Sequence, residues 1–305
     1  MNLNWKGIFL WSNWFYGFCA VMLSVESSLL LLNRMPNPYL LLLIYLGTIV
    51  YYTYAYLVEC KLGEHNERVS WYLEKQKYLQ IRQLVYTCIC LYIGFLKLDA
   101  FNNFLHASLF VKIILLISFL LSAAYYLPTI HFISFQNSRN KGVLKSISIA
   151  WVWTFTCCFI PIWLGSNNPT VLLTKAVNFY FLQFFIYVLI LAILFDIKDM
   201  PKDQKEAVYT IAVRLGAHKT VKQIIVPLLI LYYIIVMYWV AVIGISAYYL
   251  ALQGILIVLS YLIAHWVLKQ KAIYVNILLI DGLLVIKAAL GIAFVYINGV
   301  RLPII

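Results

Sequence analysis

Three aspartates, Asp196, Asp199 and Asp203, stand close together at the end of a long apolar run. On an α-helix, residues at i, i+3 and i+7 lie at about 0°, 300° and 340° around the axis, so their carboxylates share one face. Like charges at this spacing repel, and burying a carboxylate at mid-membrane costs about 2.5–3.5 kcal/mol. A divalent cation removes both costs, and Mg²⁺ binds carboxylate oxygen while it keeps water and phosphate as other ligands. The spacing therefore indicates a magnesium site.

A second interpretation of the same stretch stays open, because Lys198, Lys202 and Lys205 alternate with the aspartates. In this interpretation the aspartates belong to a solvated helix end and form local ion pairs. Pro201 adds a further constraint, since a proline either kinks a helix or begins a new turn. Spacing alone does not decide between a metal site and a set of ion pairs.

The composition of the chain places these aspartates in a membrane protein. Of its 305 residues, 64% are hydrophobic and 11% are charged, whereas soluble domains carry roughly 45–50% apolar and about 25% charged residues. The mean hydropathy is +0.89, and lipid removes the need to hide so much apolar surface. The net charge of +12 is explained by basic loops at one membrane face, so nucleic-acid binding is not expected. We expect an all-α, polytopic bundle in which residues 1–305 form one transmembrane domain.

Apolar windows of about 18 residues or more predict nine spanning helices, give or take one. They cover residues 9–32, 37–58, 83–98, 104–128, 144–164, 172–195, 223–245, 247–268 and 273–297. The two longest connections follow the second and sixth of these helices. The first, at about 60–82, has amphipathic spacing and is predicted to lie along the membrane interface.

Basic residues are distributed unevenly between the two ends of the predicted helices. Seventeen of the 23 Lys and Arg residues fall in the N-terminal segment and in the loops after the second, fourth, sixth and eighth helices. These residues are Lys6, Lys61, Arg68, Lys75, Lys77, Arg82, Arg139, Lys141, Lys145, Lys198, Lys202, Lys205, Arg214, Lys219, Lys222, Lys269 and Lys271. The opposite loops hold only Arg34, Lys97, Lys175 and Arg301. The positive-inside rule therefore predicts a cytoplasmic N-terminus and a cytoplasmic Asp-rich loop.

The run from Asp196 to Asp203, followed by Thr210 and by Val213-Arg214-Leu215-Gly216, resembles the second Asp-rich motif of the UbiA superfamily of intramembrane prenyltransferases. That motif is written D-x-x-D-x-x-x-D, then Thr, then V-R-L-G. The resemblance is local and covers about 21 residues. The expected helix count and the two long loops on one membrane face are similar to the family pattern.

The resemblance implies a chemistry and a set of residue roles. Asp196, Asp199 and Asp203 would hold Mg²⁺, and the metal would grip an isoprenyl diphosphate whose allylic carbon is transferred to a lipophilic, typically aromatic, acceptor. Arg139, Lys141 and Lys145, with Lys198, are the cations that this resemblance assigns to the diphosphate. Each of these cations is also explained by membrane topology or by lipid headgroups.

The first Asp-rich motif of the family, N-x-x-x-D-x-x-x-D, is absent from this sequence. In the best alignment Thr53, Leu57 and Lys61 stand at its three positions. Thr53, Tyr56, Glu59 and Arg68 are therefore predicted to be a remnant of the first motif or part of a substrate channel. Such a site binds one metal instead of two, uses Lys61 or Arg68 in place of the second, or has lost catalysis and serves lipid or partner binding.

Two ionisable residues, Asp281 and Lys287, fall inside the last apolar run. Ionisable groups at this depth usually face the interior of a bundle. A structural contact to another helix explains them, and so does a mid-membrane site of a transporter, which is a third functional hypothesis. The six cysteines lack metal-ligand spacing and are predicted to be packing residues.

Overall fold

The computed structural model describes residues 7–60, 67–98, 100–126, 142–166, 169–205, 207–269 and 273–298. Every regular element within these ranges is a helix. The prediction of an all-α protein is therefore confirmed.

The first half of the chain forms helices that run back and forth along the bundle. They are η1 (Gly7–Trp11), α1 (Trp14–Leu32), α2 (Pro38–Cys60), α3 (Glu67–Glu74), α4 (Gln76–Tyr92), η2 (Ile93–Lys97), α5 (Ala100–His106) and α6 (Leu109–Tyr126).

The second half of the chain continues the same pattern. They are α7 (Val143–Thr154), η4 (Phe155–Phe159), α8 (Ile160–Gly165), η5 (Pro169–Leu173), α9 (Lys175–Lys205), α10 (Ile211–Leu215), α11 (Ala217–Thr220), η6 (Val221–Ile225), α12 (Val226–Ile243), α13 (Tyr248–Val267) and α14 (Ile273–Asn298).

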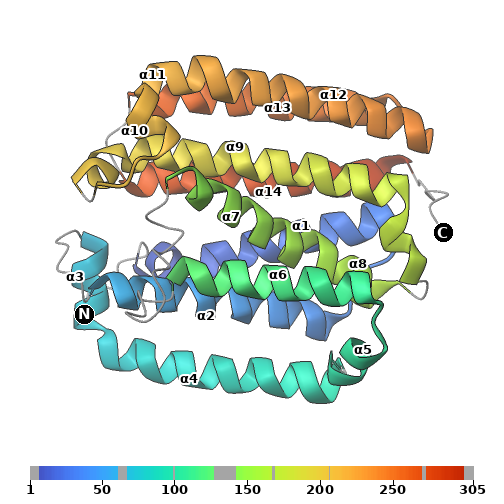
Figure 1. Ribbon diagram of the computed structural model, residues 1–305, viewed down its shortest axis with the longest axis horizontal. Helices are drawn as coiled ribbons and strands as arrows, with labels where there is room; N and C mark the ends of the chain where they lie inside the picture. The colour runs from blue at the N-terminus through green and yellow to red at the C-terminus, as the bar shows by residue number, and fades with distance from the viewer. Residues whose placement is uncertain are drawn as a thin grey trace.

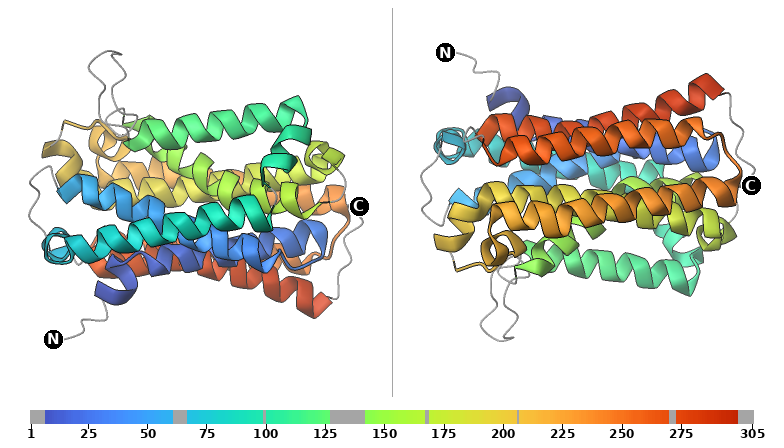
Figure 2. Two further views of the ribbon diagram at one scale, coloured as in Figure 1. Left: turned by 90° about the horizontal axis from the view of Figure 1, so that it is seen from below. Right: turned by 90° about the horizontal axis from the view of Figure 1, so that it is seen from above.

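The long helices lie side by side along one axis, as Figures 1 and 2 show. Helix α1 packs against α2 and α14, and α9 packs against α7 and α12, so α1 and α9 lie inside the bundle. In Figure 1, α4 lies at one edge of the bundle and α12 with α13 at the other. The short helices α3, α10 and α11 gather at the end where α9 terminates. We call this the Asp-rich end, and the end with α5 and α8 the opposite end.

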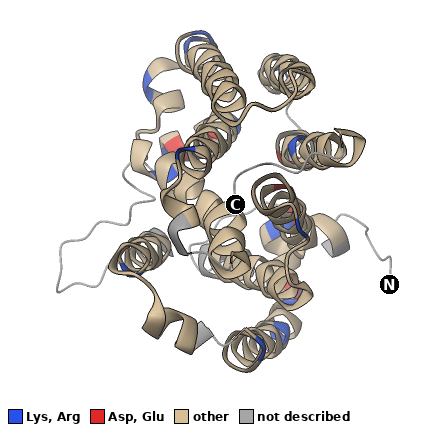
Figure 3. Cartoon of the chain, turned by 90° about the vertical axis from the view of Figure 1, so that its right-hand side faces the viewer, with Lys and Arg blue, Asp and Glu red and all other residues tan. Residues whose placement is uncertain are grey.

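The described part of the chain contains eight helical segments that are long and apolar enough to cross a membrane. A ninth, shorter apolar helix covers Leu109–Ala123. The outer helices carry large exposed apolar side chains, such as Leu84 at 67%, Leu96 at 71% and Phe119 at 69% exposure. Lipid tolerates such a surface, and the ribbon seen along the bundle axis carries few charged residues (Figure 3). The chain is an integral, multi-pass membrane protein.

Several helix boundaries differ from the sequence prediction. Helix α4 begins at Gln76 instead of 83, and α6 begins at Leu109 instead of 104 because the chain leaves the helical conformation between α5 and α6. Helix α9 continues to Lys205 instead of ending near 195. Pro201 lies inside this helix without ending it, so the run from Asp196 to Asp203 is helical throughout.

The segment predicted to lie along the interface forms α3 and the first turns of α4. Val69 and Tyr72 of α3 and Leu79 of α4 are buried, whereas Leu73 is exposed. The amphipathic spacing therefore fits a short helix that packs its apolar side onto α2 and η1.

Candidate functional site

The aspartates of the motif extend from the buried part of α9 toward its C-terminus. Asp196 and Asp203 are seven residues, about two helical turns, apart, and therefore face the same way. Both are buried, with exposures of 1% and 4%. A carboxylate in such a position needs a partner to offset the lost hydration.

That partner is Lys145, in the first turn of α7. Its Nζ lies 3.1 Å from Oδ1 of Asp196 and 3.2 Å from Oδ2 of Asp203. The hydroxyl of the neighbouring Ser146 donates a hydrogen bond to the other oxygen of Asp196. The lysine ammonium thus neutralises two carboxylates that would otherwise repel each other across two turns of α9.

A glycine allows α7 to begin at this place. Gly142 has a φ of +55°, and a Cβ there would lie 2.0 Å from the carbonyl oxygen of Tyr209. The chain just before α7 therefore passes directly against the segment that leads into α10. Thr210 caps α10 by accepting a hydrogen bond from the backbone N–H of Val213 at 3.3 Å, which gives the threonine of the motif a structural role.

Asp199 does not join the other two aspartates at Lys145. It pairs with Lys198 at 2.9 Å, and its side chain is 34% exposed. Within the described residues, no group of three or more His, Cys, Asp or Glu side chains could hold a metal. Two carboxylates nevertheless suit Mg²⁺, which completes its octahedron with phosphate oxygens and water. The donor set fits magnesium that takes its remaining ligands from a diphosphate or from water.

The cations predicted for a diphosphate divide into three groups. Lys145 lies at the two buried aspartates, and Lys198 is occupied by Asp199. Arg139 and Lys141 lie outside the described residues. Lys145 is therefore the one predicted diphosphate ligand that the described structure places beside Asp196 and Asp203.

The predicted remnant of the first motif forms a second polar cluster at the same end of the bundle. The guanidinium of Arg68 lies 3.5 Å from the ring centroid of Tyr56 and donates a hydrogen bond of 2.7 Å to Oδ1 of Asn13. Thr53 is buried and accepts hydrogen bonds of 3.0 Å from Asn13 and from Arg82. The side chain of Glu59 lies outside the described part of the chain.

Tyr72 completes this second cluster from α3. Its hydroxyl accepts a hydrogen bond from Asn13 at 2.8 Å and donates one to the carbonyl oxygen of Trp11 at 2.8 Å. Burial raises the pKa of the Tyr72 hydroxyl above its ordinary value, so the group remains a protonated donor at neutral pH. Within the described residues, this second cluster is therefore built of basic and neutral groups.

A third acidic group, Asp281, lies on α14. Asp281 is 4% exposed, and its Oδ2 has no hydrogen-bond partner. The Asp-rich end therefore presents Asp196 and Asp203 of α9 with Lys145 of α7.

Sequence reasoning missed several residues of these clusters. Ser146 and Asn13 carry no signal in one sequence, because isolated polar residues are common at helix ends. Arg82 was counted only as a topological cation, although it is 6% exposed. Glu26 could be found from the sequence, because an acidic residue inside an apolar run is rare and faces the interior. Its carboxylate pairs with Lys287, so the structural explanation of Lys287 is confirmed.

No protein-family model, curated protein or solved structure matches the chain.

Proposed function

We propose that the protein is an intramembrane prenyltransferase of the UbiA type. The observation that carries the proposal is the arrangement of Asp196, Asp203 and Lys145, in which two buried carboxylates and one cation meet at a membrane-embedded helix end. Oxygen ligands for Mg²⁺ beside a lysine are what a diphosphate headgroup requires. The Asp-rich motif at residues 196–216 supports the same assignment.

In the proposed reaction the bond between the allylic carbon and the diphosphate oxygen breaks, and its electron pair leaves with the diphosphate. An electron-rich acceptor carbon forms the new bond and then loses a proton, so atoms and charge balance. Magnesium, when bound, would neutralise the charge that grows on the leaving group. The chain itself supplies Lys145 to hold the diphosphate and an apolar bundle that excludes water, and Asp196 and Asp203 would hold the magnesium.

The proposal includes a location and a set of partners. Lys145, Lys198, Lys202, Lys205 and Arg214 belong to the Asp-rich end, and this excess of cations supports a cytoplasmic orientation of that end. The substrates would be an isoprenyl diphosphate supplied from the cytoplasmic side and a lipophilic, typically aromatic, acceptor supplied from the lipid bilayer. No nucleic-acid partner is proposed.

The test compares the purified variants Asp196→Asn and Asp203→Asn with Glu74→Gln. Glu74 is the exposed last residue of α3, so Glu74→Gln is a matched loss of carboxylate charge. Farnesyl and geranylgeranyl diphosphate serve as donors with Mg²⁺, and a panel of phenols and naphthols serves as acceptors. We expect the two Asn variants to lose at least 100-fold in kcat, roughly the value of one strong transition-state contact, while Glu74→Gln turns over normally. Equal turnover in all variants would refute the proposal.

A second function is favoured by one specific observation. Lys145 already neutralises both buried carboxylates, and the first motif is replaced by the cluster of Arg68, Asn13 and Thr53. These facts suit a family member that binds an anionic lipid or a partner without catalysis. The same prenyl diphosphates distinguish the two functions. Saturable binding of a prenyl diphosphate without product formation supports the binding protein and rejects the transferase.

A further inference from the structure

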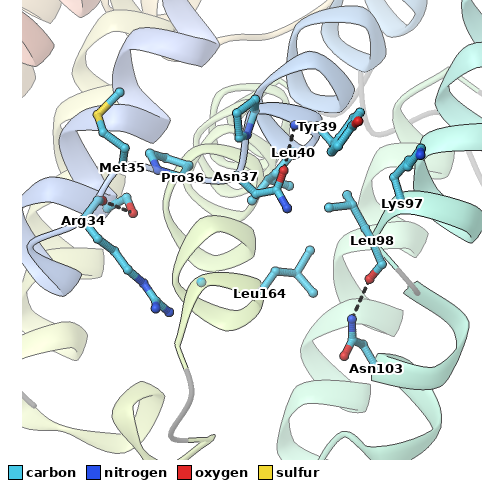
Figure 4. Close-up of a pocket in the computed structure, with 13 residues that line it drawn as sticks. Arg34, Met35, Pro36, Asn37, Tyr39, Leu40, Lys97, Leu98, Asn103 and Leu164 are labelled. Carbon is cyan, nitrogen blue, oxygen red and sulfur yellow. Dashed lines mark hydrogen bonds between the residues drawn. The ribbon is translucent and has the colours of Figure 1, made fainter.

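A cavity of about 690 Å³ lies at the opposite end of the bundle, far along the bundle axis from Asp196 and Asp203. It is formed by the segment between α1 and α2, by η2 and α5, and by the end of α8 (Figure 4). Its polar lining includes Arg34, Asn37, Lys97 and Asn103, and none of the described residues that line it is acidic. The described lining therefore carries two positive charges.

The cavity is a built feature held by local contacts. The Ser28 hydroxyl donates a hydrogen bond of 2.8 Å to the carbonyl oxygen of Arg34, which fixes the turn after α1. The Asn103 amide donates one of 2.7 Å to the carbonyl oxygen of Leu98. The Lys97 ammonium lies 5.4 Å from the ring centroid of Tyr39. In Figure 4, Arg34 and Lys97 flank the cavity from opposite sides, with Leu164 between them.

Its depth in the membrane follows from the limits of the spanning segments. Four of these segments have a limit at Leu32, Pro38, Lys97 and Gly165, and the cavity is lined by Pro38, Lys97, Gly165 and the residues that follow Leu32. The cavity therefore opens at the level of the lipid headgroups. Large apolar side chains next to it, Phe95 at 59%, Leu96 at 71% and Phe101 at 60% exposure, offer a path for acyl chains.

Membrane topology does not account for the two cations. The positive-inside rule favours Lys and Arg at one face of the membrane, and the described part of this end carries Arg34, Lys97, Lys112 and Lys175. Two of these four, 63 positions apart in the sequence, line the same cavity. A cationic cavity at headgroup depth suits a phosphate ester.

We propose that this cavity binds the phosphate-bearing headgroup of an anionic phospholipid, with Arg34 and Lys97 as its cationic contacts. The polar amides of Asn37 and Asn103 provide additional hydrogen-bonding groups, and the acyl chains lie along the apolar surface of η2 and α5. The site is separate from the aspartates, and this proposal does not depend on the proposed transferase activity.

The test uses the full-length protein in detergent, delipidated and then titrated with phosphatidylglycerol or phosphatidylcholine, with bound lipid counted by native mass spectrometry. We expect one phosphatidylglycerol to bind preferentially. Arg34→Gln and Lys97→Gln should each weaken its binding about five-fold, as expected for one cation near a lipid phosphate. Lys97→Arg keeps the charge and should keep the binding. Lys175→Gln, a matched loss of charge at an exposed residue of the same end, should have no effect.

Three results would overturn the proposal. Equal binding of phosphatidylcholine would remove the requirement for an anionic lipid. An equal loss in Lys175→Gln would show that only the overall charge of this end matters. Displacement of the lipid by glycerol phosphate at equal concentration would assign the cavity to a soluble phosphate. Circular dichroism and size-exclusion chromatography identify any variant that is misfolded. If one of the two Gln variants is misfolded, the Gln variant at the other position decides.

Discussion

The ammonium of Lys287 on α14 lies 2.8 Å from both carboxylate oxygens of Glu26 on α1. The two side chains are 1% and 0% exposed, and Lys287 also lies 4.7 Å from the ring centroid of Phe184. A paired, fully enclosed charge of this kind joins the first and last long helices across 261 positions of sequence.

Lys287→Met should therefore destabilise the protein by about 3–5 kcal/mol, because it leaves the Glu26 carboxylate buried without a counter-charge. The double variant Glu26→Gln/Lys287→Met should recover most of this loss, since neither partner then carries a charge. Denaturant unfolding in detergent measures both. If the double variant is as unstable as the single one, packing of Lys287 and not its charge is what matters.

Gly291 allows α14 to approach Glu26 closely. A Cβ at this position would lie 2.6 Å from Cγ and from Oε1 of Glu26. Gly291→Ala should therefore displace the ion pair and lower the free energy of unfolding by about 1–3 kcal/mol, the usual cost of overpacking. Gly282, on the same helix, has no atom within 4 Å of its Cβ position, so Gly282→Ala is the matched control and should be neutral or stabilising. Similar losses at both positions would mean that helix flexibility, and not the close approach, determines stability.

The helices could be predicted from sequence because each one is a long apolar run, and lipid selects for that property alone. The boundaries were less accurate where polar residues continue a helix. Asp196 to Lys205 read as a loop, yet α9 includes them, because its buried face continues through Asp196, Ile197 and Asp203. A hydropathy profile does not detect a helical segment whose charged side chains are buried as ion pairs.

The partners of the aspartates could not be predicted, because pairing depends on how helices pack. Lys145 is 58 positions from Asp203, and nothing in its local sequence distinguishes it from Lys198, which pairs with Asp199 instead. The local ion-pair interpretation is confirmed for Asp199, which pairs with its neighbour at the helix end. Asp196 and Asp203 are instead paired with Lys145 of another helix, and the magnesium site stays a prediction.

Lys145→Met should expose a competition between lysine and metal at this pair. Without the ammonium, Asp196 and Asp203 are left unpaired, and stability should fall by about 3 kcal/mol. Millimolar Mg²⁺ should then raise the melting temperature of the variant by several degrees and that of the wild type much less, because only the variant has free carboxylates. Lys219→Met, which removes an exposed lysine of α11, is the control. A variant that responds to Mg²⁺ no more than this control would argue against any cation site at the two aspartates.

The orientation of the bundle can be tested with the two ends of α9. Lys175 begins this helix and Lys205 ends it, so a reporter attached at each position must lie on a different side of the membrane. Green fluorescent protein fused after Lys205 should fluoresce in cells, because it folds in the cytoplasm, and alkaline phosphatase fused after Lys175 should be active, because it needs the opposite compartment. The excess of Lys and Arg at the Asp-rich end is the physical reason for this expectation. The reverse pattern would place Asp196 and Asp203 outside the cytoplasm, away from a cytoplasmic supply of diphosphates, and would remove the transferase from consideration.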